Sequence, residues 1–454
     1  MNRKQGQRFN PGNGDIDKNV KMQKIKATVH RKLLEILDLN EARRIPLEQL
    51  HEECSQRVDA LLTEQQYPLS GPEKQKLLNE VMDEVFGFGP LEAFLRDPYI
   101  SDILVNGPHQ VYIERNGQLE STDATFMNEE HLMRVIRRIG TNVGRRIDES
   151  SPMLDARLPD GSRVNAIIPP LALDGPALSI RRFGVNPIDI HRLLELETIT
   201  EDMAFFVEAC VQCKMNILIS GGTGTGKTTL LNALSRWIPD GERVVTIEDT
   251  AELQLQREHV VRLETRPPNI EGEGTITQRD LVRNSLRMRP DRIIVGEVRG
   301  AETLDMLQAM NTGHEGSMTT VHANSPRDAL RRLENMVSMA GLNYPVRAIR
   351  EQMNSALDVL IHLDRITGGS RKLTKIVEIT GMEGDTICLH DIFCFNQIGV
   401  DSDGKAYGQF EASGVCPLLL DRLKAEGVEI PHGLFQRRVL ATSGSENNKR
   451  VQNK

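Results

Sequence analysis

Apolar residues recur at helical spacing in the first part of the chain. Leu77, Leu78, Val81, Met82 and Val85 fall on one face of a helix, and Ser70 with Glu73 forms a capping box just before them. We therefore predict a helical region over residues 26–88. Residues 1–25 are polar and show no periodicity, so we expect them to be a disordered tail.

Short strand-like runs replace the helical pattern over residues 89–187. Turn signals such as Asn106-Gly107, Asn116-Gly117 and Asp160-Gly161 separate these runs, and a helix is predicted from Asn128 to Gly140. The mixture indicates an α+β domain. Its predicted strands are Ile103 to Val105, Val111 to Ile113, Asn165 to Ile168 and Leu178 to Arg181.

We place a linker at residues 188–196, near Pro187 to Leu196. After this linker, strands and helices alternate. The alternation predicts an α/β domain over residues 197–441, in which a parallel sheet carries helices on both faces. Such sheets bind ligands at the carboxyl ends of their strands. A disordered tail is expected at residues 442–454. The predicted strands are Asn216 to Ser220, Val244 to Ile247, Arg292 to Val295 and Met318 to Val321.

The first of these strands runs into the sequence GGTGTGKT, residues 221–228, which is a phosphate-binding loop in its expected setting. Its glycines let backbone N–H groups converge on phosphate oxygens, and the following helix directs its positive end at the anion. Lys227 supplies a charge for the β and γ phosphates, and Thr228 a hydroxyl for Mg²⁺. The alternatives are a chance Gly/Thr turn and a dinucleotide fingerprint, and Lys227-Thr228 argues against the second. The predicted ATP-binding residues are Gly222, Thr223, Gly224, Thr225, Gly226, Lys227, Thr228 and Thr229.

Carboxylates end two further predicted strands. Glu297 closes the run RIIVGE, where it is predicted to orient the attacking water and to reach the Mg²⁺ shell through water. Glu248 and Asp249 follow the run VVTI, and Glu248 is predicted to help coordinate the metal or to act as a general base. The alternative for Glu248 is that it caps the following turn.

Two histidines lie in the segment GHEGSMTTVHAN, residues 313–324. His322 ends a predicted strand, so we expect its imidazole at the same sheet edge, in hydrogen-bonding reach of the γ-phosphate. His314 is also interpreted as a structural loop residue. Neither fits a metal site, because no third ligand accompanies the pair.

Composition narrows the class of protein. A length of 454 residues suggests two or three domains, and the net charge of −8 argues against a general nucleic-acid-binding surface. No apolar run approaches the length of a membrane span, and the polar N-terminus lacks a signal peptide, so we expect a cytoplasmic protein. Seven Lys or Arg in residues 1–30 form either a solvated tail or a contact for an acidic partner or membrane. The six cysteines, among them the pair Cys210 and Cys213, lack zinc-site spacing and are expected to be reduced and mostly buried.

Four segments in order, GGTGTGKT, VTIEDTAELQL, RMRPDRIIVGEVRGAE and TGHEGSMTTVHAN, resemble the phosphate loop, Asp box, Walker B segment and His box of the type II/type IV secretion ATPases. The resemblance covers roughly residues 85–435. The sequence GEVRGAE and the helical extension before residue 88 most resemble the CpaF-type ATPases of Tad/Flp pilus systems. The resemblance implies a RecA-like phosphate-loop domain in a homohexamer that works with inner-membrane pilus platform proteins at the inner face of the cytoplasmic membrane.

The resemblance also implies a role for arginines of the first domain. Arg157 and Arg163 match the arginines that reach the γ-phosphate in this superfamily, and Arg181 or Arg182 are alternatives for the same role. Guanidinium groups suit it because they pair bidentately with phosphate oxygens. For each of Arg157 and Arg163 a surface ion pair is the competing interpretation.

The sequence departs from the superfamily in lacking the four-cysteine zinc module of some type II relatives. The predicted function is an ATP-hydrolysing hexameric motor for Tad/Flp pilus assembly, with ATP and Mg²⁺ as cofactors and no stable nucleic-acid partner. A conjugative or effector secretion ATPase of the same superfamily is the first alternative. A nucleic-acid translocase is the second, although the chain is only 4% aromatic and offers few stacking platforms.

Overall fold

The computed structural model divides the chain into two compact units, Met1–Val185 and Asn186–Lys454. It describes residues 25, 28–29, 32–33, 47–64, 69–115, 118–183, 188–266, 268, 273–341 and 344–442. The expected tail at residues 1–25 lies outside this range except for Ile25, which is helical and buried, so the tail prediction is wrong at that residue. The predicted Asn116-Gly117 turn, Pro187 and residues 443–454 also lie outside the described residues.

Helices begin the first unit, as predicted. The apolar residues of α3 (Leu47–Glu64) and α4 (Gly71–Val85) pack together with Ile25, Val29 and Leu33. At the start of α4 the carboxylate of Glu73 accepts hydrogen bonds from the backbone N–H and the hydroxyl of Ser70, and the predicted capping box is present. Helix α4 leads through η1 (Gly89–Leu91) and α5 (Glu92–Arg96) into a sheet.

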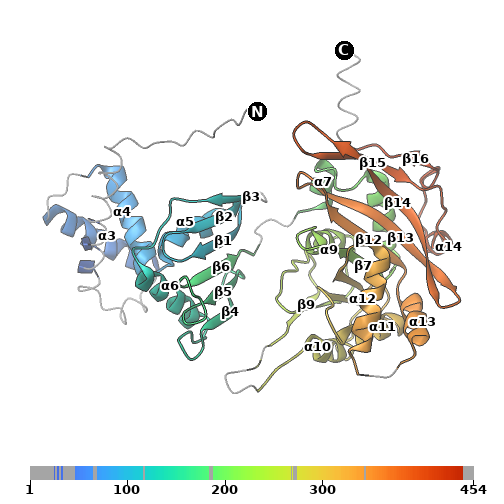
Figure 1. The fold of residues 1–454 in the computed structure, drawn as a ribbon, viewed down its shortest axis with the longest axis horizontal. Coiled ribbons are helices and arrows are strands. Elements are labelled where there is room, and N and C mark those ends of the chain that lie inside the picture. The colour runs from blue at the N-terminus through green and yellow to red at the C-terminus, as the bar shows by residue number, and fades with distance from the viewer. Residues whose placement is uncertain are drawn as a thin grey trace, which may run out of the picture. The chain divides into compact units, whose positions relative to one another are not determined.

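The sheet of the first unit is antiparallel with the strand order β3-β2-β1-β6-β5-β4 (Figure 1). Its apolar face packs against α6 (Glu129–Asn142), whose N-cap is Asn128 as the sequence predicts. The opposite face carries the polar residues of β4, β5 and β6. The strands are β1 (Ile100–Asn106), β2 (Val111–Arg115), β3 (Gln118–Ser121), β4 (Met153–Arg157), β5 (Arg163–Ile167) and β6 (Ala177–Arg181).

The second unit is built on a ten-stranded sheet with the order β16-β15-β14-β13-β12-β7-β11-β10-β8-β9 among the described residues (Figure 1). The strands from β12 to β9 in this order are mutually parallel, and β12 to β16 are antiparallel. The parallel strands are β7 (Ile217–Gly221), β8 (Val244–Glu248), β9 (Val260–Glu264), β10 (Arg292–Val295), β11 (Met318–His322) and β12 (Val359–Arg365).

The predicted α/β class is thereby confirmed, and all four predicted strands of this domain are present. The predicted parallel sheet is present from β12 to β9, and a meander of antiparallel strands, which was not predicted, extends it. This meander comprises β13 (Arg371–Glu383), β14 (Thr386–Val400), β15 (Ala406–Ala412) and β16 (Arg438–Val439). Antiparallel neighbours need only short turns, and such turns join β12 to β13, β13 to β14 and β14 to β15. Between β15 and β16 the chain forms a helix over residues 420–425.

Helices cover both faces of the parallel strands, and alternate strand residues point into two cores. On one face Ile217 and Ile219 pack with α8 (Glu201–Gln212) and α9 (Lys227–Ser235). On the other face Leu218 and Val295 pack with α11 (Glu302–Asn311), α12 (Pro326–Ser338) and α13 (Val346–Ala356). The remaining helices are α7 (Ile190–Glu195), which lies in the stretch predicted as a linker, α10 (Gln278–Ser285) and α14 (Leu420–Ala425).

The chain end departs from the prediction at one residue. The hydroxyl of Thr442, placed in the expected tail, donates to the Glu197 carboxylate over 2.8 Å.

Three of the six cysteines, Cys54, Cys210 and Cys213, are buried, and burial raises the pKa of the Cys210 and Cys213 thiols. Buried thiols of raised pKa are poor nucleophiles. Cys388 and Cys394 are half-buried and Cys416 is exposed, so the expected burial holds for half of the cysteines. No described helix combines the length and apolar character needed to cross a membrane.

Candidate active site

The loop between β7 and α9 has the conformation of a phosphate-binding loop. Gly224 and Gly226 have φ values of 71° and 95°, a region that favours glycine, and Gly226 is the N-cap of α9. A side chain at Gly221 would bring its Cβ to 2.4 Å from the carbonyl oxygen of Leu363, so only glycine fits there. The hydroxyl of Thr225 donates to the carbonyl of Gly222 over 3.0 Å. The predicted residues 222–226 therefore form the loop, and residues 227–229 form the first turn of the helix that follows it.

Lys227 is buried at the base of this loop, with 7% of its surface exposed. Its Nζ lies 3.1 Å from the carbonyl oxygen of Gly221 and 2.9 Å from that of Gly222, and it donates to both. Burial lowers the pKa of Lys227, while the nearby Glu297 carboxylate acts in the opposite direction. The ammonium group is thus held at the loop, where the phosphates of a nucleotide would compete with two backbone carbonyls for its protons. Thr228 and Thr229 are half-buried in the first turn of α9.

His322 connects Lys227 to a carboxylate on a third strand. Its Nδ1 lies 3.2 Å from Lys227 Nζ, and its Nε2 lies 3.1 Å from Oε1 of Glu297. Burial lowers the pKa of His322, and the positive charge of Lys227 lowers it further, which favours the neutral ring. A neutral imidazole accepts from the ammonium at Nδ1 and donates from Nε2 to the carboxylate. The structure therefore brings together three residues predicted from separate motifs.

Arg299 continues this network from the far side of Glu297. Its Nη2 donates to Oε2 of Glu297 over 2.9 Å, and its Nη1 lies 3.3 Å from the carboxylate of Asp249. Arg299 lies within the segment GEVRG, and no role was predicted for it. The signal was its position two residues after the carboxylate, on the segment that leaves the active edge of the sheet.

Glu248 lies at the end of β8, beside β10, and only 3% of it is exposed. Its Oε1 accepts from the backbone N–H groups of Glu252 and Leu253 over 2.8 and 2.9 Å. These hydrogen bonds cap the turn that follows β8, as the alternative interpretation of Glu248 predicts. Its Oε2 is buried and has no hydrogen-bond partner within the described part of the chain. One oxygen is thus structural, and the other remains available to a ligand.

Gly296 makes room for this carboxylate. A Cβ at Gly296 would lie 2.8 Å from Cγ of Glu248. Glycine at position 296 therefore has a packing reason, because a larger residue would displace Glu248.

The pH dependence of stability gives a test of this environment. Burial raises the pKa of Glu248 from 4.5 to about 7. A carboxyl group whose pKa is raised by folding binds its proton more tightly in the folded state. Its contribution to the free energy of unfolding is therefore greatest below pH 4.5 and is lost as the pH rises through about 7. We expect the free energy of unfolding to fall by about 3 kcal/mol over this interval from this group alone.

Urea unfolding at several pH values measures the effect, followed by the fluorescence of Trp237, the single tryptophan of the chain, which packs in the second unit. The difference between wild type and Glu248→Gln should change with pH across this window. A difference that stays constant from pH 4.5 to 7.5 would show that Glu248 titrates normally.

Arg371, from the start of β13, contacts the tip of the phosphate loop. Its Nε donates to the carbonyl of Gly224 over 2.9 Å, and its Cδ lies 3.4 Å from the position that a Cβ on Gly226 would occupy. This residue was not predicted, because β13 lies far along the chain from the loop. We interpret it as a positioning residue that holds the loop open for phosphate.

Arg371→Ala should therefore weaken nucleotide binding more than it slows the chemical step. We expect KM for ATP to rise by about fivefold, which corresponds to about 1 kcal/mol, with kcat nearly unchanged. The matched control is Arg365→Ala, since Arg365 lies directly opposite Arg371 on the neighbouring strand β12. Equal kinetics for both variants would contradict the positioning role.

The predicted arginines lie on the first unit, at the polar face of its sheet. Arg157 and Arg163 are directly opposite each other on β4 and β5, and Arg181 is opposite Arg163 on β6. Arg163 pairs with Asp155, with Nη2–Oδ2 and Nε–Oδ1 distances of 2.8 and 3.2 Å, which is the ion pair of the competing interpretation. Arg182 instead donates to the backbone carbonyl of Asp97.

His314 does not join the active edge of the sheet. It precedes β11, whereas His322 ends that strand, so the two histidines belong to opposite ends of the strand. The carbonyl of His314 accepts from the Ser317 hydroxyl over 2.7 Å. Its position agrees with the interpretation as a structural loop residue.

The residues at this edge fit a nucleotide-bound Mg²⁺ better than a metal held by protein alone. No cluster of three or more His, Cys, Asp or Glu in the described ranges is arranged to hold an ion. Mg²⁺ in nucleotide enzymes takes most of its ligands from phosphate and water, and needs only one or two from the protein. The Thr228 hydroxyl, the Glu297 carboxylate and the unpaired Oε2 of Glu248 are the predicted donors.

The family model described as "Type II/IV secretion system protein" matches residues 84–388, about two thirds of the chain. The chain belongs to this family. It is 38% identical over 313 residues to a putative conjugal transfer protein of Mycobacterium tuberculosis, with 68% of this chain and 88% of the relative covered. It is also 35% identical to the conjugal transfer protein TrbB of Rhizobium radiobacter, with 63% and 86% covered. The predicted superfamily is confirmed, and the CpaF subtype is not tested by these relatives.

Two solved structures are also similar to this chain. The chain is 30% identical to the VirB11 ATPase of the Brucella suis type IV secretion system, with 63% of this chain and 91% of that chain covered and a TM-score of 0.35. It is 22% identical to the pilus retraction motor PilT, solved with bound ADP, with 61% and 78% covered and a TM-score of 0.46.

Proposed function

We propose that this chain is an ATP hydrolase that drives a secretion machine of the type IV or conjugal-transfer kind. The observation that carries the proposal is the continuous contact from the phosphate loop to a carboxylate, Lys227 to His322 to Glu297. The chain covers most of the length of relatives that are named as conjugal transfer and VirB11 proteins. These relatives support a secretion or conjugal-transfer machine more than a pilus motor.

In the proposed mechanism, the amides of the loop and Lys227 bind the β and γ phosphates. A water molecule attacks the γ-phosphorus, the bond from this phosphorus to the bridging oxygen of ADP breaks, and the proton of the water passes to Glu297. His322 holds Glu297 by its Nε2–H and senses the charge of Lys227 at Nδ1. Thr228, Glu248 and Glu297 would hold Mg²⁺, which supplies charge neutralisation on the phosphates when bound.

Arg157 and Arg163 are proposed to complete the site from the first unit of the same or a neighbouring subunit of a homohexamer. Their side chains share one sheet face, so both guanidinium groups could turn to a single phosphate if Arg163 releases Asp155. An exposed ion pair of this kind is worth about 1 kcal/mol or less, which a triphosphate would easily outweigh.

Hydrolysis would then be coupled to movement of the two units about residues 188–196. A peripheral position at the inner face of the cytoplasmic membrane, reached through partner proteins, belongs to the same proposal.

ATP turnover and nucleotide affinity of the Arg157→Ala/Arg163→Ala variant test this part of the proposal. We expect turnover to fall at least tenfold with ATP still bound, and mixing with an excess of Lys227→Ala subunits should restore turnover if the arginines act across subunits. The control Arg146→Ala alters an exposed arginine of the same unit. Normal turnover of the double variant would remove the arginines from the mechanism.

The Tad/Flp pilus motor is the second candidate. The GEVRGAE wording and the helices α3 and α4, most of which precede the family match at residue 84, support it. Deletion of the gene, with complementation by wild type or Lys227→Ala, separates the two. Loss of conjugal transfer or of protein secretion with normal piliation supports the first candidate, and loss of piliation alone supports the second. Turnover stimulated by single-stranded DNA would instead indicate a translocase.

A further inference from the structure

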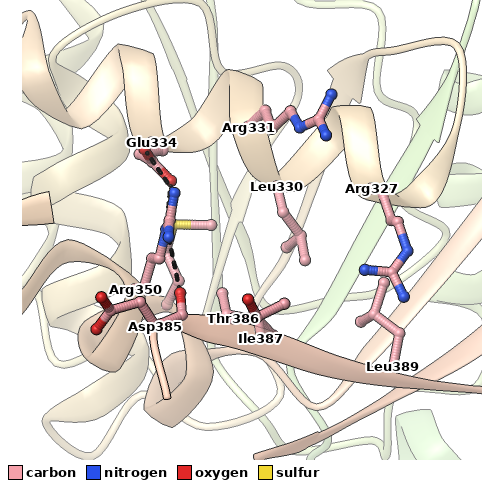
Figure 2. Close-up of a pocket in the computed structure, with 10 residues that line it drawn as sticks. Arg327, Leu330, Arg331, Glu334, Arg350, Asp385, Thr386, Ile387 and Leu389 are labelled. Atoms are coloured by element: carbon pink, nitrogen blue, oxygen red, sulfur yellow. Dashed lines mark hydrogen bonds and ion pairs between the residues drawn. The ribbon is translucent and has the colours of Figure 1, made fainter. Parts of the chain in front are cut away.

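A cavity of about 190 Å³ lies on the second unit, and no residue of the phosphate loop lines it (Figure 2). It opens between helices α12 and α13 and the strand β14. The mechanism proposed above uses none of its residues. Those that line it are Arg327, Leu330, Arg331, Glu334, Arg350, Met353, Asp385, Thr386, Ile387 and Leu389.

The floor of the cavity is apolar and fixed. Leu330 and Ile387 are each 7% exposed, and Met353 is fully buried. One end is closed by Arg350, which donates to both carboxylate oxygens of Glu334 over 2.8 and 3.3 Å and to the carbonyl of Asp385 over 2.7 Å (Figure 2). This bidentate pair leaves neither group free for a ligand.

The other end carries two arginines without counter-charges. Arg327 and Arg331 are one turn apart on α12, and both are exposed. Among the described residues neither guanidinium has a hydrogen-bond or ion-pair partner. The third arginine that lines the cavity, Arg350, is the one paired with Glu334. In a chain of net charge −8, this cavity therefore combines an apolar floor with two uncompensated positive charges.

The size of the cavity indicates what kind of ligand it takes. Sites for small organic molecules usually measure about 300–1,000 Å³, so this cavity is too small for a nucleotide or a similar cofactor. It suits one or two protein side chains, as the central pocket of an interface does. No aromatic residue lines it, so it offers no stacking surface for a nucleobase.

We propose that this cavity docks a segment of a partner protein in which an apolar side chain is flanked by acidic residues. The apolar side chain enters between Leu330, Met353 and Ile387. The flanking carboxylates pair with Arg327 and Arg331, which accept them bidentately. This interaction surface is separate from ATP hydrolysis, so its test does not depend on the proposed function.

A random dodecapeptide phage library selected on the full-length protein tests the proposal. Peptides that also bind the Arg327→Glu/Arg331→Glu variant are removed by counter-selection. We expect the enriched peptides to share a Leu, Ile or Met with Asp or Glu within two positions. A fluorescein-labelled peptide of that sequence should bind wild type about tenfold more tightly than the variant, and more weakly at high salt.

The control variant Arg283→Glu/Arg287→Glu makes the same change of charge on α10 and the turn after it, and should bind the peptide as wild type does. Thermal unfolding checks that both variants are folded. Failure to enrich acidic peptides, or equal binding to wild type and to the cavity variant, would overturn the proposal. A change in the oligomeric state of the peptide-free cavity variant would also contradict it, because the occupant would then be a second copy of the chain.

Discussion

Lys227→Ala should lose ATP turnover by a factor of about 100 to 1,000 while remaining folded. The variant removes the ammonium that stands at the base of the phosphate loop, where 7% of the residue is exposed. In the transition state this charge would balance the oxygens of the transferred phosphoryl group. The fold should persist because alanine is a good helix former at the start of α9, and because a desolvated charge is removed.

Phosphate release measures the loss, and thermal unfolding checks the fold. The control is Lys424→Ala, which removes an exposed lysine on α14. Turnover at the wild-type rate by Lys227→Ala would remove the phosphate loop from the reaction. An unfolded Lys227→Ala protein would show that the ammonium stabilises the loop itself, contrary to this account.

Glu297→Gln should also reduce turnover by about 100-fold or more, but for a different reason. Glutamine keeps the shape of the side chain and its contact with the Arg299 guanidinium, which lies 2.9 Å away. It cannot accept the proton of the attacking water. The affinity for ATP should stay within about threefold of wild type, because the loop contacts are untouched.

Equilibrium binding of a fluorescent ATP analogue and steady-state phosphate release separate the two effects. The control Glu383→Gln changes an exposed glutamate at the end of β13. A fall in affinity that matches the fall in turnover would assign Glu297 a role in binding. Unchanged turnover would exclude it as the proton acceptor.

The residues that could be predicted from the sequence are those that end parallel strands. Gly221, His322 and Glu248 each close a short apolar run, and the register of the parallel strands places such ends at one edge of the sheet. Local sequence was sufficient for these residues, because the run and its polar end are adjacent in the chain.

The contacts of Arg371 and Arg299 could not be predicted in the same way. Arg371 reaches the phosphate loop because β12 lies beside β7, a pairing between distant segments that periodicity does not specify. The antiparallel extension was missed, although the turn at Gly384, with φ of 60°, and the long alternating runs beside it are hairpin signals. Strand order depends on which apolar faces pack best, and a single sequence does not state this.

The two roles of Glu248 show a further limit of the sequence. VVTI followed by two acids predicted a metal or base site and, as the alternative, a turn cap. The structure shows the cap at Oε1 and leaves Oε2 unpaired. Both interpretations concern the same carboxylate, and only the three-dimensional arrangement assigns each oxygen.

The chemical state of the nucleotide bound to Glu297→Gln shows whether Glu297 accepts the proton of the attacking water. Wild type and variant are incubated with Mg²⁺ and radiolabelled ATP, freed of unbound nucleotide, and the retained nucleotide is separated by chromatography. We expect ADP on wild type and ATP on Glu297→Gln, because the phosphate loop of the variant binds ATP while the proton acceptor is missing. ADP on both proteins in equal amounts would contradict it, since hydrolysis would then proceed without the Lys227–His322–Glu297 network.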